Sequence, residues 1–90
     1  MAILIKTDGT TKNVLPTNGT FFTAKELHDF VGGFFEFINP GNKIMVVNED
    51  GWNLKLPVNN IASMITTMAK NLCSEIIVGD VVVCDMEEIQ

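Results

Sequence analysis

The sequence predicts a small α+β domain in which two helices pack on an antiparallel or mixed sheet, in the order ββαββ(β)αβ. Short apolar runs are separated by turn residues at positions 8–9, 39–42 and 48–51. One helix start is marked by a capping box, and a second helix is marked by apolar residues at three- and four-residue spacing from Ile61 onward. Ninety residues suit one hydrophobic core, so residues 1–90 are predicted to form a single domain.

The chain opens with a predicted β-hairpin. Residues 2–6 form a short apolar run, and the Asp8-Gly9 pair that follows favours a tight turn, because both residues tolerate positive φ. Residues 11–15 should therefore return antiparallel to the first strand. Pro16 then ends the hairpin, since proline cannot donate to a sheet ladder.

The first helix is predicted over residues 24–31. Thr23 provides an N-cap and Glu26, three residues later, completes a capping box. The pair Gly32-Gly33 ends the helix, because glycine enters the left-handed conformation at little cost.

A second hairpin and a further strand are predicted next. Residues 34–39 place Phe35 and Phe37 on one side, yet both sides are largely apolar, which favours a central or interfacial strand. Residues 44–48 form its antiparallel partner. A third strand is expected over residues 52–56, where apolar residues alternate with polar ones.

The second helix is predicted to begin near Asn59 or Asn60, either of which can cap it. Its apolar residues recur at the spacing of one buried stripe, which comprises Ile61, Met64, Ile65, Met68, Ala69 and Leu72.

The final β-branched run covers residues 75–85 and is interrupted by Gly79-Asp80. This pair fits either a two-residue hairpin turn or a kink, and the kinked strand is favoured because the hairpin arms would be very short. The acidic tail, residues 86–90, is expected to fray.

Composition narrows the function classes. Hydrophobic residues make up 47% of the chain and charged residues 19%, which predicts a homo-oligomer that covers apolar surface. The net charge is −5, with no arginine among the six basic residues, so binding to nucleic acid through a basic surface is not expected. The apolar run at the start is too short for a signal peptide or a membrane span, which predicts a cytoplasmic protein without a membrane partner.

The residues offer little material for catalysis. His28 is the single histidine, and Cys73 and Cys84 are too far apart for a CxxC pair. Cys84 follows three valines, and apolar surroundings raise a thiol pKa. The sequence therefore predicts a non-enzymatic protein with no catalytic residues, no metal site and no cofactor.

A binding face is the more productive hypothesis. Six phenylalanines and one tryptophan exceed what one sheet face needs, so some rings should be semi-exposed and available to a ligand or partner. Core and homodimer packing is the competing interpretation of the same rings. The candidate ligand-binding residues lie on the second hairpin and the segment after it: Phe35, Phe37, Asn48, Glu49, Asp50, Trp52, Pro57 and Asn59.

Four motifs occur in order: FVGGFFE at 30–36, MVVNEDG at 45–51, LPVN at 56–59 and VGDVV at 78–82. This succession resembles a family of small bacteriophage and mobile-element proteins catalogued as a domain of unknown function. The resemblance implies a setting in which short accessory proteins act against host defences. It suggests an anti-defence sponge that sequesters a small nucleotide-derived immune signal, or alternatively a protein-binding inhibitor or modulator of a host defence protein.

Overall fold

The computed structural model describes residues 2–38, 43–70 and 76–89. Seven helices and strands and one 3₁₀ helix follow one another along these residues. They are β1 (Ala2–Ile5), β2 (Thr11–Val14), α1 (Ala24–Val31), β3 (Phe35–Ile38), β4 (Ile44–Asn48), α2 (Asn60–Lys70), β5 (Val81–Cys84) and the 3₁₀ helix Met86–Glu88.

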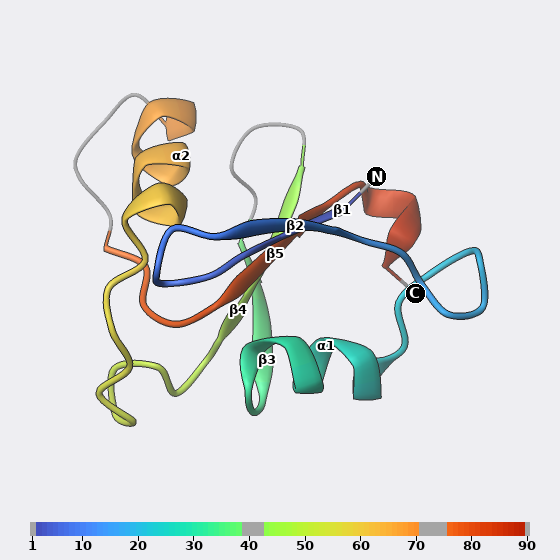
Figure 1. The fold of residues 1–90 in the computed structure, drawn as a ribbon, viewed down its shortest axis with the longest axis horizontal. Helices are drawn as coiled ribbons and strands as arrows, with labels where there is room; N and C mark the ends of the chain where they lie inside the picture. Colours follow the sequence, from blue (N-terminus) through green and yellow to red (C-terminus); the bar gives the residue numbers. More distant parts are fainter. Residues whose placement is uncertain (1, 39–42, 71–75, 90) are drawn as a thin grey trace.

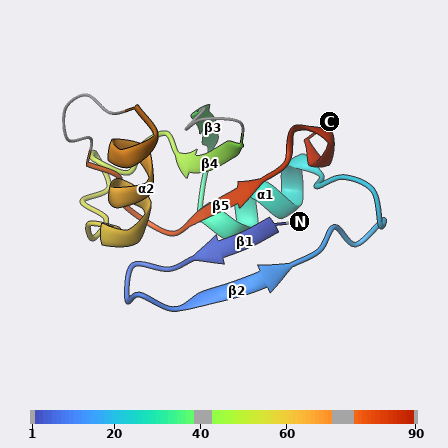
Figure 2. The ribbon, with the colours of Figure 1, turned by 90° about the horizontal axis from the view of Figure 1, so that it is seen from above.

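The five strands form one sheet in the order β2-β1-β5-β4-β3, and each neighbouring pair is antiparallel. Figure 2 shows this order from β2 to β3, and Figure 1 shows α1 along one side of the sheet with α2 at one end. The predicted α+β class is confirmed. The bracketed strand of the predicted order, over residues 52–56, does not form.

Each face of the sheet carries its own apolar cluster. Leu4, Val46 and Val82 point toward α1, whose Leu27 and Val31 are buried with them. Their neighbours along the strands point the other way, because successive side chains of a strand alternate between the two faces. That second cluster includes Ile5, Met45 and Val81 with Ala62 of α2.

The first hairpin forms as predicted. β1 and β2 pair with Ala2 opposite Val14 and Ile5 opposite Thr11. Gly9 has a φ of 91° in the connecting turn, which explains why glycine is suited to this position.

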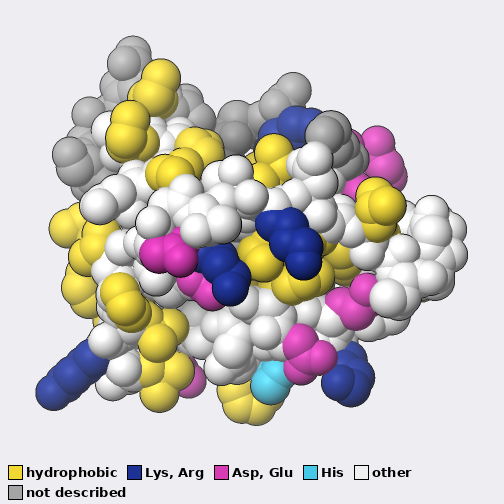
Figure 3. All heavy atoms as spheres, viewed as in Figure 1, with side chains coloured by type: hydrophobic (Ala, Val, Ile, Leu, Met, Phe, Trp, Pro, Cys, Tyr) yellow, Lys and Arg dark blue, Asp and Glu magenta, His cyan; other side chains and the backbone are white. Residues whose placement is uncertain are grey.

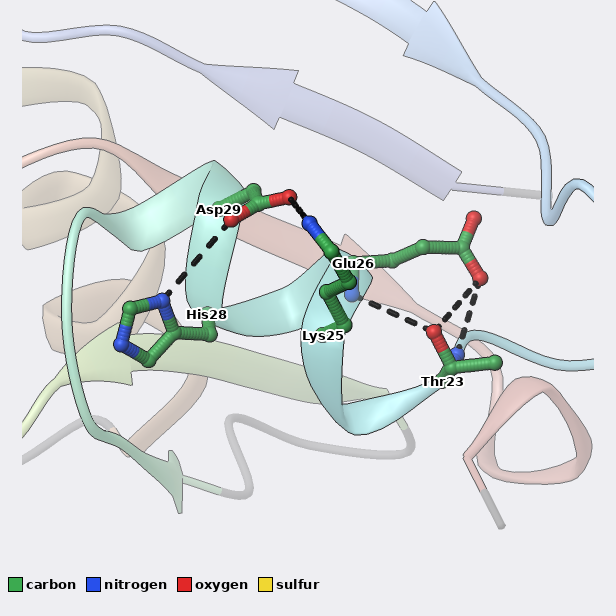
Figure 4. A network of polar contacts seen from close by, with 5 residues as sticks. All are labelled: Thr23, Lys25, Glu26, His28 and Asp29. Atoms are coloured by element: carbon green, nitrogen blue, oxygen red, sulfur yellow. Dashed lines mark hydrogen bonds and ion pairs between the residues drawn. The ribbon is translucent and has the colours of Figure 1, made fainter.

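Helix α1 also has the predicted ends (Figure 4). The Thr23 hydroxyl accepts a hydrogen bond from the Glu26 N–H at 3.2 Å, and the Glu26 carboxylate accepts one from the Thr23 N–H at 3.0 Å. The hydrogen bond from the Thr23 backbone lowers the pKa of the Glu26 carboxyl. Gly32 ends the helix with a φ of 80°.

The predicted strand over residues 52–56 is wrong, because this segment is a succession of turns. The Leu54 N–H donates to the Asp50 carbonyl at 2.9 Å, and the Leu56 N–H donates to the Gly51 carbonyl at 3.0 Å. Lys55 has a φ of 57°, which no strand residue adopts. These local hydrogen bonds override the apolar alternation.

The predicted buried stripe of α2 is partly wrong. Ala62 and Thr66 are buried, whereas Met64 and Met68 are 62% and 75% exposed. The Thr66 hydroxyl donates to the Ala62 carbonyl at 3.0 Å, so this small polar residue fits against the sheet without an unpaired group. Ile61 and Ile65 pack partly buried beside it, while the side chain of Ala69 and all of Leu72 lie outside the described residues.

Three further differences concern the place of β3 in the sheet, the run before β5 and the C-terminal tail. β3 lies at the edge of the sheet, so of the two predicted alternatives the central strand is wrong, and an interfacial strand stays a prediction. Upstream of β5, Gly79 has a φ of 82° and Val78 makes one bridge to Val58. The run therefore breaks at Gly79 without forming a hairpin. Ile89, in the tail expected to fray, bridges to Phe22. The predicted turn at 39–42 lies outside the described residues.

Candidate functional site

The edge strand β3 presents unused backbone groups. The Phe34 carbonyl accepts a hydrogen bond from the Glu49 N–H at 3.0 Å, and the register continues with Glu36 opposite Val47. Hydrogen-bonded and non-hydrogen-bonded pairs alternate along an antiparallel ladder. The backbone N–H and C=O groups of Phe35 and Phe37 therefore face away from β4, at the open side of the sheet.

The opposite edge of the sheet has a different chemistry. The Lys6 N–H donates to the Thr10 carbonyl at 2.9 Å, and the alternation then places the backbone groups of Thr11 and Asn13 on the outer side of β2. Both side chains are exposed and polar, and exposed Lys12 lies between them. Charged and polar residues of this kind discourage pairing at an edge. The outward-facing positions of β3 are instead aromatic, with one charged residue, exposed Glu36, between them.

An apolar groove runs beside the β3 edge on the α1 face of the sheet. Its volume is about 440 Å³, within the range of ligand pockets. Phe35 is partly buried and Phe37 is 49% exposed, and their ring centroids lie 5.6 Å apart. The groove is lined by these two rings together with Phe21, Phe22, Thr23, Ala24, Leu27 and Ile89. Half of the Phe37 side chain is thus available to a partner.

A smaller hollow lies on the other face of the same edge. It has a volume of about 130 Å³, and its walls include Trp52, Asn48, Glu49 and Glu36. Trp52 is 65% exposed at this hollow. Figure 3 shows apolar side chains gathered around the loop that follows β4, at the lower left.

Two candidate asparagines are occupied in holding the fold together. Asn48 is buried, and its side chain donates to the Val31 carbonyl at 3.0 Å while accepting from the Asp50 N–H at 2.8 Å. Asn59 is fully buried and donates to the carbonyls of Ile5 and Gly79 at 2.9 and 3.0 Å. These hydrogen bonds engage the amide groups that a ligand would otherwise contact.

The remaining candidates do not share one site. Asp50 is exposed in the turn after β4, where its N–H donates to the Asn48 side chain. Pro57 lines a third hollow with Gly79 and Asp80, away from Phe35 and Phe37. The structure thus brings Phe35 and Phe37 together on one face, places Asn48, Glu49 and Trp52 around a hollow on the other, and separates Pro57 and Asn59 from both.

Sequence reasoning did not place α1, the two residues Phe21 and Phe22 before it, or the tail in the site. Phe21, Phe22, Leu27 and Ile89 line the groove with the two β3 rings. The surplus of large rings in the sequence was a signal for Phe21 and Phe22, since some of those rings had to lie outside the core. Ile89 gave no such signal, because its position depends on the bridge to Phe22.

Reactive groups in the described residues do not gather into a catalytic arrangement. Cys84 is buried, and burial raises the pKa of its thiol to about 11, so it is protonated at neutral pH. His28 is exposed and lies 3.8 Å from the Asp29 carboxylate (Figure 4). Its ring also contacts the Phe34 ring edge-on, with 5.9 Å between the centroids. Across residues 2–38, 43–70 and 76–89, no three acidic, cysteine or histidine side chains cluster as metal ligands do. Cys73 lies outside these ranges.

The fold and the groove define a small α+β protein whose antiparallel sheet has one polar edge and one aromatic edge. The family model described as "Domain of unknown function (DUF3846)" matches residues 1–89, and the chain belongs to this family. Comparison with curated proteins and with solved structures gives no match. Within the described residues, no helix has the length and apolar character needed to cross a membrane.

Proposed function

We propose that this protein is a protein-binding module, which captures an extended segment of another protein on the β3 edge. The observation that carries the proposal is that Phe35 and Phe37 offer both their backbone groups and their side chains to a partner. Their backbone groups face the open side of the sheet, and their side chains line the groove of about 440 Å³. Strand addition uses this combination, because main-chain hydrogen bonds supply affinity and side-chain pockets supply specificity.

The family resemblance suggests the biological setting of such binding. A phage-encoded accessory protein that occupies a strand-binding surface would act stoichiometrically on a host or defence protein in the host cytoplasm. This role as an inhibitor or modulator needs no cofactor and no catalytic group. The net charge of −5 is also compatible with this role, because the two surfaces of a protein–protein interface usually carry complementary charge.

The test combines selection of peptides with variants of the β3 edge. Peptides selected from a random displayed library should lose about tenfold or more in affinity for Phe37→Ala, as expected when an aromatic anchor is truncated. Phe37→Pro should weaken binding further, because proline also removes the outward N–H. Calorimetry measures both affinities. Hydrogen exchange at the Phe35 and Phe37 amides should slow when peptide binds.

The matched control is Asn13→Pro, which removes an outward N–H from the opposite edge. It should leave peptide affinity unchanged, and thermal melting should show that all three variants are folded. Selected peptides that bind wild type and Phe37→Pro equally, without protecting the Phe35 and Phe37 amides, would refute strand addition at β3.

The second candidate is a trap for a nucleotide-derived immune signal, and exposed Trp52 is the observation that favours it. A bound base would stack on this indole, so Trp52→Ala would weaken binding by about 1–3 kcal/mol. However, the adjoining hollow of about 130 Å³ is below the usual range of ligand pockets, and its carboxylates Glu36 and Glu49 would repel phosphate. We therefore expect cyclic dinucleotides and cyclic ADP-ribose-type signals to leave Trp52 emission unchanged. Quenching that saturates, and is confirmed by calorimetry, would contradict this expectation and support the trap.

A further inference from the structure

We infer that the segment captured on the β3 edge alternates apolar residues with lysine or arginine. This inference rests on the proposed strand addition and names the chemistry of the partner. It follows from the unlike character of the two faces that meet along β3.

An added strand would continue the pleat of the sheet, so its side chains would alternate between the two faces. On the α1 face they would lie beside Phe35 and Phe37, over the apolar groove. On the opposite face they would lie beside Glu36, which is exposed and forms a wall of the hollow with Glu49. One face of the segment therefore meets rings, and the other meets carboxylates.

The carboxylates of Glu36 and Glu49 favour a basic partner. Among the described residues, neither Glu36 nor Glu49 forms an ion pair. The ion pairs lie elsewhere, where Lys25 and His28 face Asp29 and Lys43 pairs with Asp85. Cross-strand pairs of opposite charge stabilise a sheet, and like charges directly opposite destabilise it. The net charge of −5 adds a long-range attraction for a basic segment.

A second copy of this chain is a poorer occupant. The β3 sequence FEFI carries Glu36 between the two outward-facing positions. The antiparallel register that pairs both outward-facing residues of each copy, Phe35 with Phe37, would set the two copies of Glu36 directly opposite each other. That arrangement opposes like charges on neighbouring strands.

The probes are capped peptides about eight residues long, a usual strand length, in which valine alternates with lysine or with glutamate. Fluorescence anisotropy should show the lysine peptide binding wild type about tenfold more tightly than the glutamate peptide, with the difference shrinking as salt screens the charges. Glu36→Lys should reverse this preference. Asp29→Lys changes the net charge equally, but Asp29 lies beside β2, so the preference should persist in this control.

Each alternative outcome has a separate meaning. If both peptides bind equally and both are lost in Phe37→Pro, strand addition stands and the charge inference is overturned. If neither peptide binds, the charge inference is likewise overturned, and library-selected peptides still decide the proposed function. A dimer in sedimentation that dissociates in Phe37→Pro would show a second copy at this edge and overturn the inference.

Discussion

Replacing Phe22 with alanine should lower the free energy of unfolding by about 3–5 kcal/mol, the usual cost of removing a buried phenylalanine. Phe22 is 1% exposed and precedes the capping box of α1. Its ring meets that of Phe30 edge-on at 5.8 Å, and its N–H donates to the Glu88 carbonyl at 2.8 Å. The truncation would leave a cavity where α1, the sheet and the tail meet. Urea denaturation monitored by circular dichroism measures the loss.

Phe34→Ala is the matched control, because it deletes the same side chain from a position that is 69% exposed. Its effect should stay within about 0.5 kcal/mol, as is usual for surface substitutions. Equal losses at Phe22 and Phe34 would contradict the burial that distinguishes them. A total stability of about 5–15 kcal/mol is usual for small domains, so Phe22→Ala would remove a large share of it.

Replacing Asn59 with alanine should cost about 2–4 kcal/mol, because it leaves buried polar groups unpaired and removes a helix cap. The Asn59 side chain donates to the carbonyls of Ile5 and Gly79, at 2.9 and 3.0 Å, and accepts from the Ala62 N–H at 3.1 Å. One amide thus joins the end of β1, the break before β5 and the start of α2. Thermal and urea unfolding measure the effect.

Two further variants separate the roles of the Asn59 amide. Asn59→Asp keeps the acceptor for α2 but replaces the donor with an oxygen facing two carbonyls, so it should destabilise at least as much as alanine at neutral pH. Asn60→Ala alters the exposed neighbour and should change stability by no more than about 0.5 kcal/mol. A small loss in Asn59→Asp would show that the helix cap, and not the two donated hydrogen bonds, supplies the stability.

Features set by local chemistry could be predicted from the sequence. Thr23 and Glu26 define the start of α1 within four residues, and the Asp8-Gly9 pair defines the first hairpin. The second hairpin likewise follows from neighbouring residues. In each case the residues that form the cap or the hairpin are close in the chain, so their spacing in the sequence is enough to predict it.

Features set by distant partners could not be predicted in the same way. Met64 and Met68 follow helical spacing, yet the sheet contacts a different face of α2, on which Ala62 and Thr66 are buried. Asn59 looked like a ligand-binding amide because its partner Ile5 lies 54 residues away.

The candidate site was predicted in part for the same reason. Phe35 and Phe37 stood out as surplus rings, but the edge position of β3 depends on the order of all five strands. Ile89 joined the groove only through the bridge to Phe22. Binding by any of the predicted residues stays a prediction.

The central position of β5 bears on how the sheet assembles. Each hairpin, β1 with β2 and β3 with β4, arises from neighbours in the chain. In the sheet, β5 joins the two hairpins, because it pairs with β1 on one side and with β4 on the other. Ile3 pairs with Val83 across nearly the whole chain, and contacts of such long range slow folding. Until residues 81–84 insert, the inner edges of both hairpins are open to wrong pairings. The rate at which this strand inserts therefore sets how long the folding chain is exposed to aggregation.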